Sequence, residues 1–332
     1  MSEPILSVRG LRTEFRTTDY LVRAVDGLSY DLHAGRTLAV VGESGSGKSV
    51  HALSILRLLP MPPARIVGGE ILYRGRDLLK LPAEEMRKLR GDRIAMIFQE
   101  PMTSLNPVLR VGEQIAESVV LHKGATRAEA EARAVELLGK VGIPSPDKRI
   151  RDYPHQFSGG MRQRAMIAMA LACDPDVLIA DEPTTALDVT IQAQILELLK
   201  ELQQGSQMAL VLITHNIGVV AEMADDVVVM YAGRAVEKAP VQDIFRAPKH
   251  PYTRALMGSV PSIFERKDRL AAIPGQPPDL SGERVGCPFA PRCSEALARC
   301  GTDDPGFFEL PGGRLSNCWK AEGESVQAGA AS

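Results

Sequence analysis

The segment Val40-Val41-Gly42-Glu43-Ser44-Gly45-Ser46-Gly47-Lys48-Ser49 carries the clearest structural signal in this chain. Apolar, β-favouring residues lead into it from Leu38, and helix-compatible residues follow it from Val50 to Leu59. The order is therefore strand, then G-x-x-x-x-G-K-S, then helix, which is the context that confirms a phosphate-binding loop. The alternative, a glycine-rich turn that matches by chance, does not account for the strand and helix on either side.

This loop predicts a nucleotide site. Its backbone N–H groups can cradle the β- and γ-phosphates, and the positive end of the following helix adds attraction. Lys48 supplies a mobile positive charge to the same phosphates, and the Ser49 hydroxyl is the expected ligand of Mg²⁺. The loop alone does not say what the nucleotide is used for.

Composition limits the class of protein. The 332 residues suffice for one large domain and a smaller one, and with 45% apolar but only 5% aromatic residues we expect a core of Leu, Val, Ile and Ala. A net charge of −2 argues against a general nucleic-acid binder. No apolar run approaches the ~18 residues of a membrane span, and the N-terminus lacks the pattern of a signal peptide. We therefore expect a soluble cytosolic protein that reaches a membrane only through a partner.

Three short apolar runs suit buried strands, and each ends in polar side chains: Ile94–Phe98 in Gln99, Val177–Ala180 in Asp181 and Glu182, and Ala209–Ile213 in Thr214 and His215. Asp181 can help to hold Mg²⁺, and Glu182 can orient or deprotonate an attacking water. Gln99 is a candidate γ-phosphate sensor or Mg²⁺ ligand, and His215 is a candidate contact to the γ-phosphate. The alternative for each is a solvated side chain at the end of a strand.

Other segments frame these strands. Residues 5–32 predict antiparallel strands separated by a turn at Thr17-Thr18-Asp19. Residues 100–173 predict a helical insertion, in which Thr126 and Glu129 form a capping box at the start of a helix that runs to about Val141.

The insertion ends in a second glycine motif, Ser158-Gly159-Gly160, followed by an alanine- and methionine-rich helix to Cys173. Two glycines after a serine at a helix start make an anion-binding element. The first loop does not need it, unless it serves the nucleotide of a different molecule.

Composition changes from about residue 247. Residues 250–256 predict a linker with a short helix, and the proline-rich segment that follows has little periodicity, so it needs a staple if it is ordered. Four thiols within 32 residues supply one: Cys287, Cys293, Cys300 and Cys318. They suit zinc or an iron–sulfur cluster, and the absence of a C-x2-C pair favours the cluster. Unrelated free cysteines are the alternative. Residues 322–332 predict a disordered tail.

Together the motifs resemble those of an ABC-type ATPase, in order and in spacing: Gly42–Ser49, Gln99, Ser158-Gly159-Gly160, Val177–Glu182, Ala186-Leu187-Asp188 and His215. The resemblance covers about residues 5–257. Beyond it, His250-Pro251-Tyr252-Thr253 and the cysteine-bearing tail resemble the ATP-binding subunits of oligopeptide and dipeptide importers, a subfamily that includes some nickel importers.

The resemblance implies an α/β fold, the P-loop NTPase nucleotide-binding domain of ABC type. It has a RecA-like core, an antiparallel β subdomain and a helical subdomain, with a small irregular cysteine-bearing C-terminal extension. The implied domains are 1–257, with the helical subdomain at about 100–173, and 258–332.

The resemblance also implies residue roles. ATP is bound by Phe15, which by spacing alone is better explained as a core aromatic, and by the loop residues Gly42, Glu43, Ser44, Gly45, Ser46, Gly47, Lys48 and Ser49. Mg²⁺ is held by Ser49, Gln99 and Asp181. Glu182 is the catalytic base and His215 the switch, with Gln99 also catalytic.

The signature residues Ser158, Gly159, Gly160 and Met161 bind the ATP of a facing subunit, and Asp188 belongs to the dimer contact. The signature position often occupied by glutamine is Met161 here, and because the glycines are intact we expect activity to survive. The four cysteines resemble the ligands of a 4Fe-4S cluster, with Zn²⁺ as the alternative.

These roles imply a subunit that energises peptide import, peripheral to the cytoplasmic face of a bacterial inner membrane. Its implied partners are a second ATPase, for which we favour a related but different chain, two transmembrane permeases, and indirectly an extracytoplasmic substrate-binding protein. The alternatives are import of nickel or another small solute, a soluble ABC ATPase of DNA repair or translation, and a redox or metal sensor. No nucleic acid is expected.

Overall fold

The computed structural model describes residues 3–99, 104–185, 188–259, 273–282 and 285–325. The chain divides into two compact units that interleave along the sequence. Unit 1 comprises Met1–Leu6, Asp31–Thr37 and Leu72–Ile213, and unit 2 comprises Ser7–Tyr30, Leu38–Ile71 and Thr214–Ser332.

Unit 1 contains the parallel strands β6 (Ile94–Ile97), β7 (Val177–Asp181) and β8 (Ala209–Thr214), with β7 between the other two. Every residue of the three strands is buried, which explains their unbroken apolar sequence, because parallel strands are covered on both faces. Ile97 pairs with Ala180, so the carboxyl ends of β6 and β7 lie beside each other. The three apolar runs predicted as strands are confirmed.

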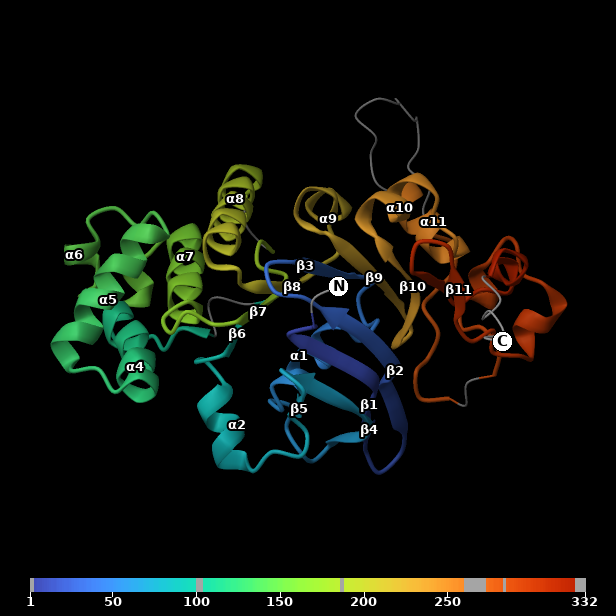
Figure 1. Cartoon of the computed structure of the whole chain (residues 1–332), viewed down its shortest axis with the longest axis horizontal. Helices are drawn as coiled ribbons and strands as arrows, with labels where there is room; N and C mark the ends of the chain where they lie inside the picture. Colours follow the sequence, from blue (N-terminus) through green and yellow to red (C-terminus); the bar gives the residue numbers. More distant parts are fainter. Residues whose placement is uncertain (1–2, 100–103, 186–187, 260–272, 283–284, 326–332) are drawn as a thin grey trace. The chain divides into compact units, whose positions relative to one another are not determined.

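Most helices of unit 1 lie between β6 and β7 in the sequence: α4 (Val111–Lys123), α5 (Arg127–Lys140), α6 (Pro146–Arg149) and α7 (Gly159–Ala170), with the 3₁₀ turn η1 (Pro154–Gln156). Helix α2 (Ala83–Leu89) precedes β6, and α8 (Val189–Ser206) follows β7. Helices α4, α5 and α7 pack on one another, as Figure 1 shows. The predicted capping box is present, because the Thr126 hydroxyl accepts from Glu129 N and the Glu129 carboxylate accepts from Thr126 N at 2.8 Å.

Unit 2 holds one sheet in which β1 (Leu6–Arg16) lies between β2 (Leu21–Leu32) and β4 (Ala64–Tyr73). The predicted turn between the first two strands is confirmed, since Thr17 N donates to Tyr20 O at 3.0 Å. The last residues of β4 pair with β5 (Arg76–Asp77).

A second sheet in unit 2 begins with β3 (Thr37–Val41), which pairs in parallel with β9 (Asp226–Tyr231). Strand β10 (Arg234–Pro240) continues it antiparallel to β9, and two strands of the C-terminal extension, β12 (Arg314–Ser316) and β11 (Phe308–Leu310), add to its edge in that order. The sequence did not predict these two strands.

The helical elements of unit 2 are α1 (Lys48–Ile55), α9 (Ile217–Met223), α10 (Val241–Arg246), α11 (Pro251–Gly258), η2 (Ala290–Arg292), η3 (Ala298–Gly301) and η4 (Trp319–Glu324). The short helix predicted at 250–256 is α11, but its description as a linker is wrong. Tyr252 of α11 is fully buried in a core cluster with Tyr231 and, from the extension, Phe289. The predicted disordered tail begins within the described residues and lies mostly outside them.

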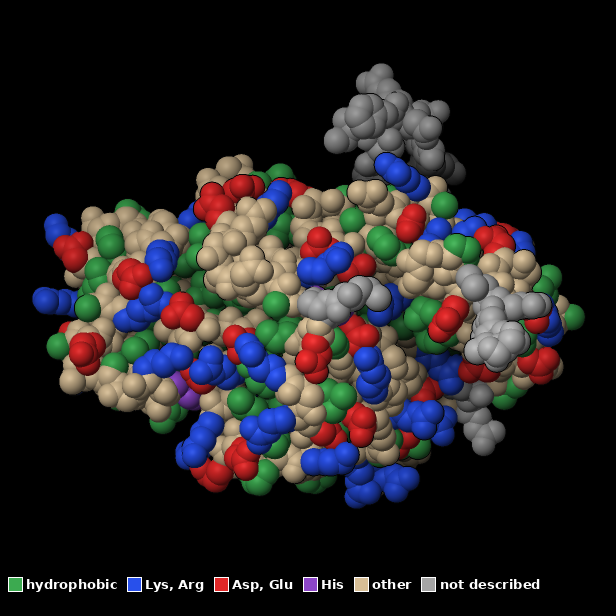
Figure 2. Space-filling view, in the orientation of Figure 1, with side chains coloured by type: hydrophobic (Ala, Val, Ile, Leu, Met, Phe, Trp, Pro, Cys, Tyr) green, Lys and Arg blue, Asp and Glu red, His purple; other side chains and the backbone are tan. Residues whose placement is uncertain are grey.

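Within the described part of the chain, no helix is both long and apolar enough to cross a membrane. Figure 2 shows positive and negative side chains interspersed over the face drawn, which agrees with the small net charge.

Candidate functional site

The phosphate-binding loop lies in unit 2, between the buried strand β3 and helix α1. Glycine is required at both ends of the loop. A Cβ on Gly42 would lie 2.2 Å from Met230 O, and a Cβ on Gly47, where φ is +97°, would lie 2.2 Å from Ala24 O. Gly47 is also the N-cap residue and has no side chain to cap the helix, so the first N–H groups of α1 face the loop as donors for an anion.

Lys48 places a positive charge over this loop. Its side chain is only 6% exposed, and its ammonium donates to Gly42 O at 2.8 Å and to Glu43 O at 2.9 Å. Ser46 is buried, whereas Ser44 and Gly45 are exposed and Ser49 is half-buried in the first turn of α1. The predicted phosphate ligands are thus together in one loop.

Two further predicted residues lie in unit 2. Phe15 is half-buried in β1, and His215 is exposed after the end of β8. The next residue, Asn216, caps α9 by accepting from Gly218 N at 3.0 Å, and its own N–H donates to the Thr214 hydroxyl at 3.0 Å. These bonds hold the backbone around His215 in a tight turn.

The predicted carboxylates lie in unit 1, where β6 and β7 end side by side. Gln99 donates to Glu182 Oε2 at 3.1 Å, and the Thr185 hydroxyl donates to the same oxygen at 2.8 Å. Glu182 has a φ of +48°, a conformation that costs free energy for a residue with a Cβ and that clusters at functional sites. Asp181 is buried beside it. The structure brings Gln99 and Glu182 together as the strand ends predicted, and Thr185 is a partner that the sequence did not reveal.

The signature residues form the start of α7, also in unit 1. Ser158 is the N-cap and accepts from Met161 N at 3.3 Å. Ser158 and Gly159 are exposed, whereas Gly160 and Met161 are half-buried. Two residues on, Gln163 donates to Pro183 O at 2.5 Å, so the signature helix is tied to the segment that follows Glu182.

The predicted dimer contact surrounds Asp188. It is exposed and caps α8 by accepting from Ile191 N at 2.9 Å. Residues 186–187, part of the same motif, lie outside the described residues.

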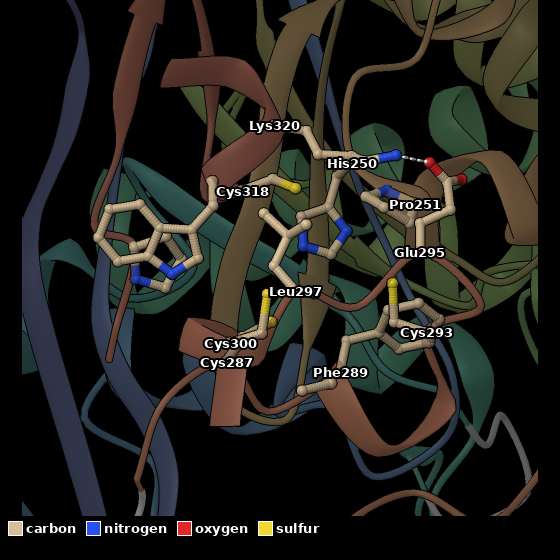
Figure 3. Close-up of a pocket in the computed structure, with 13 residues that line it drawn as sticks. His250, Pro251, Cys287, Phe289, Cys293, Glu295, Leu297, Cys300, Cys318 and Lys320 are labelled. Carbon is tan, nitrogen blue, oxygen red and sulfur yellow. Dashed lines mark hydrogen bonds and ion pairs between the residues drawn. The ribbon is translucent and has the colours of Figure 1, made fainter. Parts of the chain in front are cut away.

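The four cysteines line one apolar pocket of the extension, together with His250, Phe289, Leu297 and Trp319 (Figure 3). Cys287 and Cys300 are adjacent, since Cys287 N donates to Cys300 O at 2.8 Å. Burial raises the pKa of the Cys287 thiol to about 11 and also raises the pKa of Cys293 and Cys318.

The four thiols are the correct donor type for zinc or a cluster, but they do not form a ligand set. Among the described residues, no group of three or more His, Cys, Asp or Glu side chains is placed to hold a metal ion. Figure 3 shows Leu297 and His250 between the sulfurs. The four cysteines share one pocket, as expected of the ligands of a metal or cluster, but their sulfurs are not placed to bind one together.

Three residues around the phosphate loop were not revealed by the sequence: Tyr231 of β9, Tyr252 of α11 and Arg292 of the extension. Arg292 forms an ion pair with Glu43 and also donates to the Tyr231 hydroxyl. The Tyr252 hydroxyl accepts from the backbone N–H of Glu43. Tyr252 stands in the noted segment 250–253, but no local pattern links Arg292 to a residue 249 positions earlier.

Comparisons with known proteins agree with this geometry. Residues 25–185 match the ABC transporter family model, and residues 236–300 match the oligopeptide/dipeptide transporter C-terminal region. The chain is 54% identical to the "Probable peptide ABC transporter ATP-binding protein y4tR" of Sinorhizobium fredii, over 96% of this chain and 95% of that protein. It is 51% identical to the dipeptide transport ATP-binding protein DppD of Bacillus subtilis, with the same coverage.

Among solved structures, the ATP-binding cassette MJ0796, in a dimeric post-hydrolysis state bound to ADP and Pi, is similar with a TM-score of 0.64 and 26% identity. The match covers 71% of this chain and 98% of that one. The predicted ABC-type fold is thereby confirmed. The chain belongs to the ATP-binding proteins of ABC transporters, in their oligopeptide/dipeptide branch.

Proposed function

We propose that this chain hydrolyses ATP to energise the import of peptides through a membrane transporter. The observation that carries the proposal is Glu182 at the end of β7, where its backbone is left-handed and its carboxylate accepts hydrogen bonds from Gln99 and Thr185. A carboxylate fixed in this way can accept a proton from a water that attacks the γ-phosphate.

The proposal assigns the loop of unit 2 and the carboxylates of unit 1 to the same nucleotide, on the motif order of the family. Lys48 and the loop N–H groups bind the phosphates, and Phe15 stacks on the adenine. Ser49, Gln99 and Asp181 hold Mg²⁺, which neutralises charge on the phosphates when it is bound. His215 contacts the γ-phosphate and serves as the switch.

Substitution of Glu182 tests this assignment. We expect Glu182→Gln to lower kcat for ATP hydrolysis by about 10²- to 10⁴-fold, because the base is lost, while ATP still binds. Lys48→Ala should abolish binding of ATP. Glu197→Gln, an exposed glutamate on α8, is the matched control and should leave both unchanged. Undiminished hydrolysis in Glu182→Gln would refute the assigned base.

A second subunit completes the proposed cycle. Ser158, Gly159, Gly160 and Met161 would bind the ATP of a facing ATPase, for which we favour a related but different chain, and Asp188 would lie at their contact. Closure on two ATP molecules and opening after hydrolysis would drive the transporter.

Gly159 offers a direct test of the facing subunit. A Cβ at Gly159 meets nothing within 4 Å, so the free subunit should tolerate Gly159→Glu. We expect this change to abolish ATP-dependent dimerisation in sedimentation, with the partner ATPase present. Gly205→Glu is the control, because a Cβ there also has open space. Dimers that form equally well in both variants would count against the signature role.

The transporter's permeases need a docking surface on this chain. The predicted contact is Glu100–Pro107, of which residues 100–103 lie outside the described residues. An exposed groove, formed by α4, α5 and Leu109 just before α4, combines apolar and charged side chains: Leu109, Glu113, Ala116, Glu117, Val120, Leu121, Arg127 and Glu131. We propose that two permease subunits dock here, at the cytoplasmic face of the bacterial inner membrane.

Leu121, which is 65% exposed, allows a test of this surface. Leu121→Glu should prevent co-purification with the permeases without lowering ATP binding. Val67→Glu, at a residue 50% exposed on β4, is the control. Retention of the permeases by Leu121→Glu would place the contact elsewhere.

We propose peptides as the cargo, delivered by an extracytoplasmic binding protein, because the relatives with the same extension are named for peptide, dipeptide and oligopeptide transport. Nickel or another small solute is the second candidate. Uptake of labelled dipeptide and of nickel by cells with and without this gene separates the two.

We also propose that the four cysteines hold a 4Fe-4S cluster, with zinc as the alternative. The shared pocket and the donor type support this, and binding would have to draw the sulfurs together. Protein prepared without oxygen should be brown, with absorbance near ~400 nm that is lost in Cys300→Ser and kept in Cys173→Ala. Colourless protein with one zinc per chain would support the alternative, and colourless metal-free protein would exclude both.

A further inference from the structure

The C-terminal extension reaches into the phosphate-binding loop through one arginine. Arg292 ends the short helix η2, one residue before Cys293. Its guanidinium donates to both carboxylate oxygens of Glu43, at 2.7 Å and 3.1 Å. The Arg292 side chain is only 6% exposed and that of Glu43 22%, so this bidentate pair is shielded from solvent more than a surface salt bridge.

The guanidinium is fixed from every side. Arg292 Nε donates to Pro274 O at 2.7 Å, and one terminal nitrogen donates to the Tyr231 hydroxyl at 3.2 Å. The other terminal nitrogen reaches Ile273 O at 3.4 Å, and the guanidinium lies 5.7 Å from the centroid of the Tyr231 ring. Each nitrogen of the guanidinium therefore has an acceptor, and the side chain is held in one position.

Glu43 is held by its backbone as well. Its N–H donates to the hydroxyl of the buried Tyr252 at 2.9 Å, and its carbonyl accepts from Lys48. One residue of the loop is thus bound by two parts of the C-terminal region, at Tyr252 and at Arg292, and by the lysine of the loop.

For nucleotide binding, the charge of Glu43 matters more than the stability that the ion pair adds to the fold. Glu43 is the second residue of a loop whose proposed ligand carries several negative charges, and an uncompensated carboxylate there would repel the phosphates. Arg292 neutralises that carboxylate and holds both of its oxygens. Arg299 of the same extension, by contrast, lies 4.1 Å from the centroid of the Trp319 ring and pairs with Glu322.

We propose that Arg292 is a positioning residue for nucleotide binding: it neutralises Glu43 and fixes the phosphate-binding loop. The conformation of the segment Cys287–Cys300 thereby sets the affinity of the loop for ATP. This inference rests on the proposed role of the loop as the ATP site. It gives the extension a function in the ATPase cycle, because any change that moves η2 also moves the partner of Glu43.

The test compares charge variants of the full chain. Arg292→Gln should weaken binding of a non-hydrolysable ATP analogue about tenfold, a typical effect of losing a charge-assisted hydrogen bond, and leave kcat at saturating ATP within about twofold. The double variant Arg292→Gln with Glu43→Gln should recover most of the lost affinity, because the repelling charge is gone. A residue that only supports the fold would not be rescued in this way.

Arg299→Gln is the matched control, since Arg299 lies in the same extension and pairs with Glu322 at 2.6 Å. Equal dissociation constants for Arg292→Gln and Arg299→Gln would overturn the proposal, as would a double variant that binds no better than Arg292→Gln. If Arg292→Gln does not fold, Arg292→Lys carries the test. Lysine keeps the positive charge but cannot donate two parallel hydrogen bonds to the Glu43 carboxylate. The Arg292→Lys variant should therefore bind the analogue about threefold more weakly than Arg299→Lys, and equal binding would overturn the proposal.

Lys48→Ala separates this inference from the proposed function. If Lys48→Ala binds the analogue normally, the loop is not the ATP site and the proposed function fails first. If Lys48→Ala loses binding while the Arg292 variants behave as the control, only the role of Arg292 fails.

Discussion

At the scale of single residues, His51 ties the helix after the phosphate loop to the antiparallel sheet of unit 2. It is fully buried, its Nδ1 lies 2.8 Å from Lys48 O, and its Nε2 lies 2.7 Å from the Tyr30 hydroxyl. Burial lowers the pKa of His51 to about 4, and the bond to the Lys48 carbonyl offsets this only in part. The histidine therefore stays neutral at neutral pH.

This burial predicts an acid-sensitive fold. The unfolded chain binds a proton at His51 near pH 6.5 and the folded chain only near pH 4, so acid favours unfolding in that window. The loss for this one group is roughly 3 kcal/mol between those values. Urea midpoints at pH 7.5, 6 and 5 should fall, and they should fall less steeply in His51→Gln.

His155, which is exposed, supplies the control in His155→Gln. An identical pH dependence in the two variants would contradict the assignment to His51. Part of the pH dependence of stability should remain in both variants because of His250, whose pKa burial also lowers, to about 3.

Residue-scale prediction from sequence succeeded where a strand delivers a side chain to a known edge. Gln99 and Glu182 were predicted from the ends of two apolar runs, and parallel pairing of β6 with β7 brings them to 3.1 Å. It failed for Arg292, because its partner Glu43 is distant in sequence and only tertiary folding joins them. Sequence-based prediction also missed the hydroxyl of Thr185, whose bond to Glu182 is known only from the fold.

At the scale of elements, the capping box of α5 contributes local stability. Thr126→Ala removes the acceptor for Glu129 N and should lower the free energy of unfolding by about 1 kcal/mol. Urea denaturation followed by circular dichroism measures the loss. Thr18→Ala, in the exposed turn between β1 and β2, should change it by less than about 0.5 kcal/mol. A loss no larger than in this control would mean that the cap adds nothing.

The capping box was predictable because all of its atoms lie within four residues. Strands β11 and β12 were not, because each is three residues long and their apolar pattern is too short to read. They exist because β10 offers them a neighbour, with Glu237 paired to Ser316, and because Gly312 and Gly313 turn the chain between them with φ values of +82° and +73°.

At the scale of the whole molecule, the extension is part of the core of unit 2. Phe289 is 3% exposed, and its ring lies 5.3 Å from Tyr231 and 5.4 Å from Tyr252, centroid to centroid. The sequence predicted a segment that needed a metal staple, whereas aromatic packing already orders it. The boundary between domains 1–257 and 258–332 stays a prediction.

Phe289→Ala should therefore destabilise more than the extension. We expect a loss of about 3–5 kcal/mol in the free energy of unfolding, as is typical of a buried phenylalanine. Phe307→Ala, at a residue 42% exposed in the same extension, should cost less than about 1 kcal/mol. Urea unfolding of both variants measures these losses. Equal losses in the free energy of unfolding would mean that the extension folds apart from the core.

The outer edge of the second sheet of unit 2 has a consequence for solubility. Strand β10 spans seven residues, and β12 covers the edge that it would otherwise present. The outermost strand, β11, is only three residues long, too short to recruit another chain. A chain that ends before residue 308 would expose the backbone N–H and C=O groups of β10, and we expect it to self-associate edge to edge where the full chain stays dispersed.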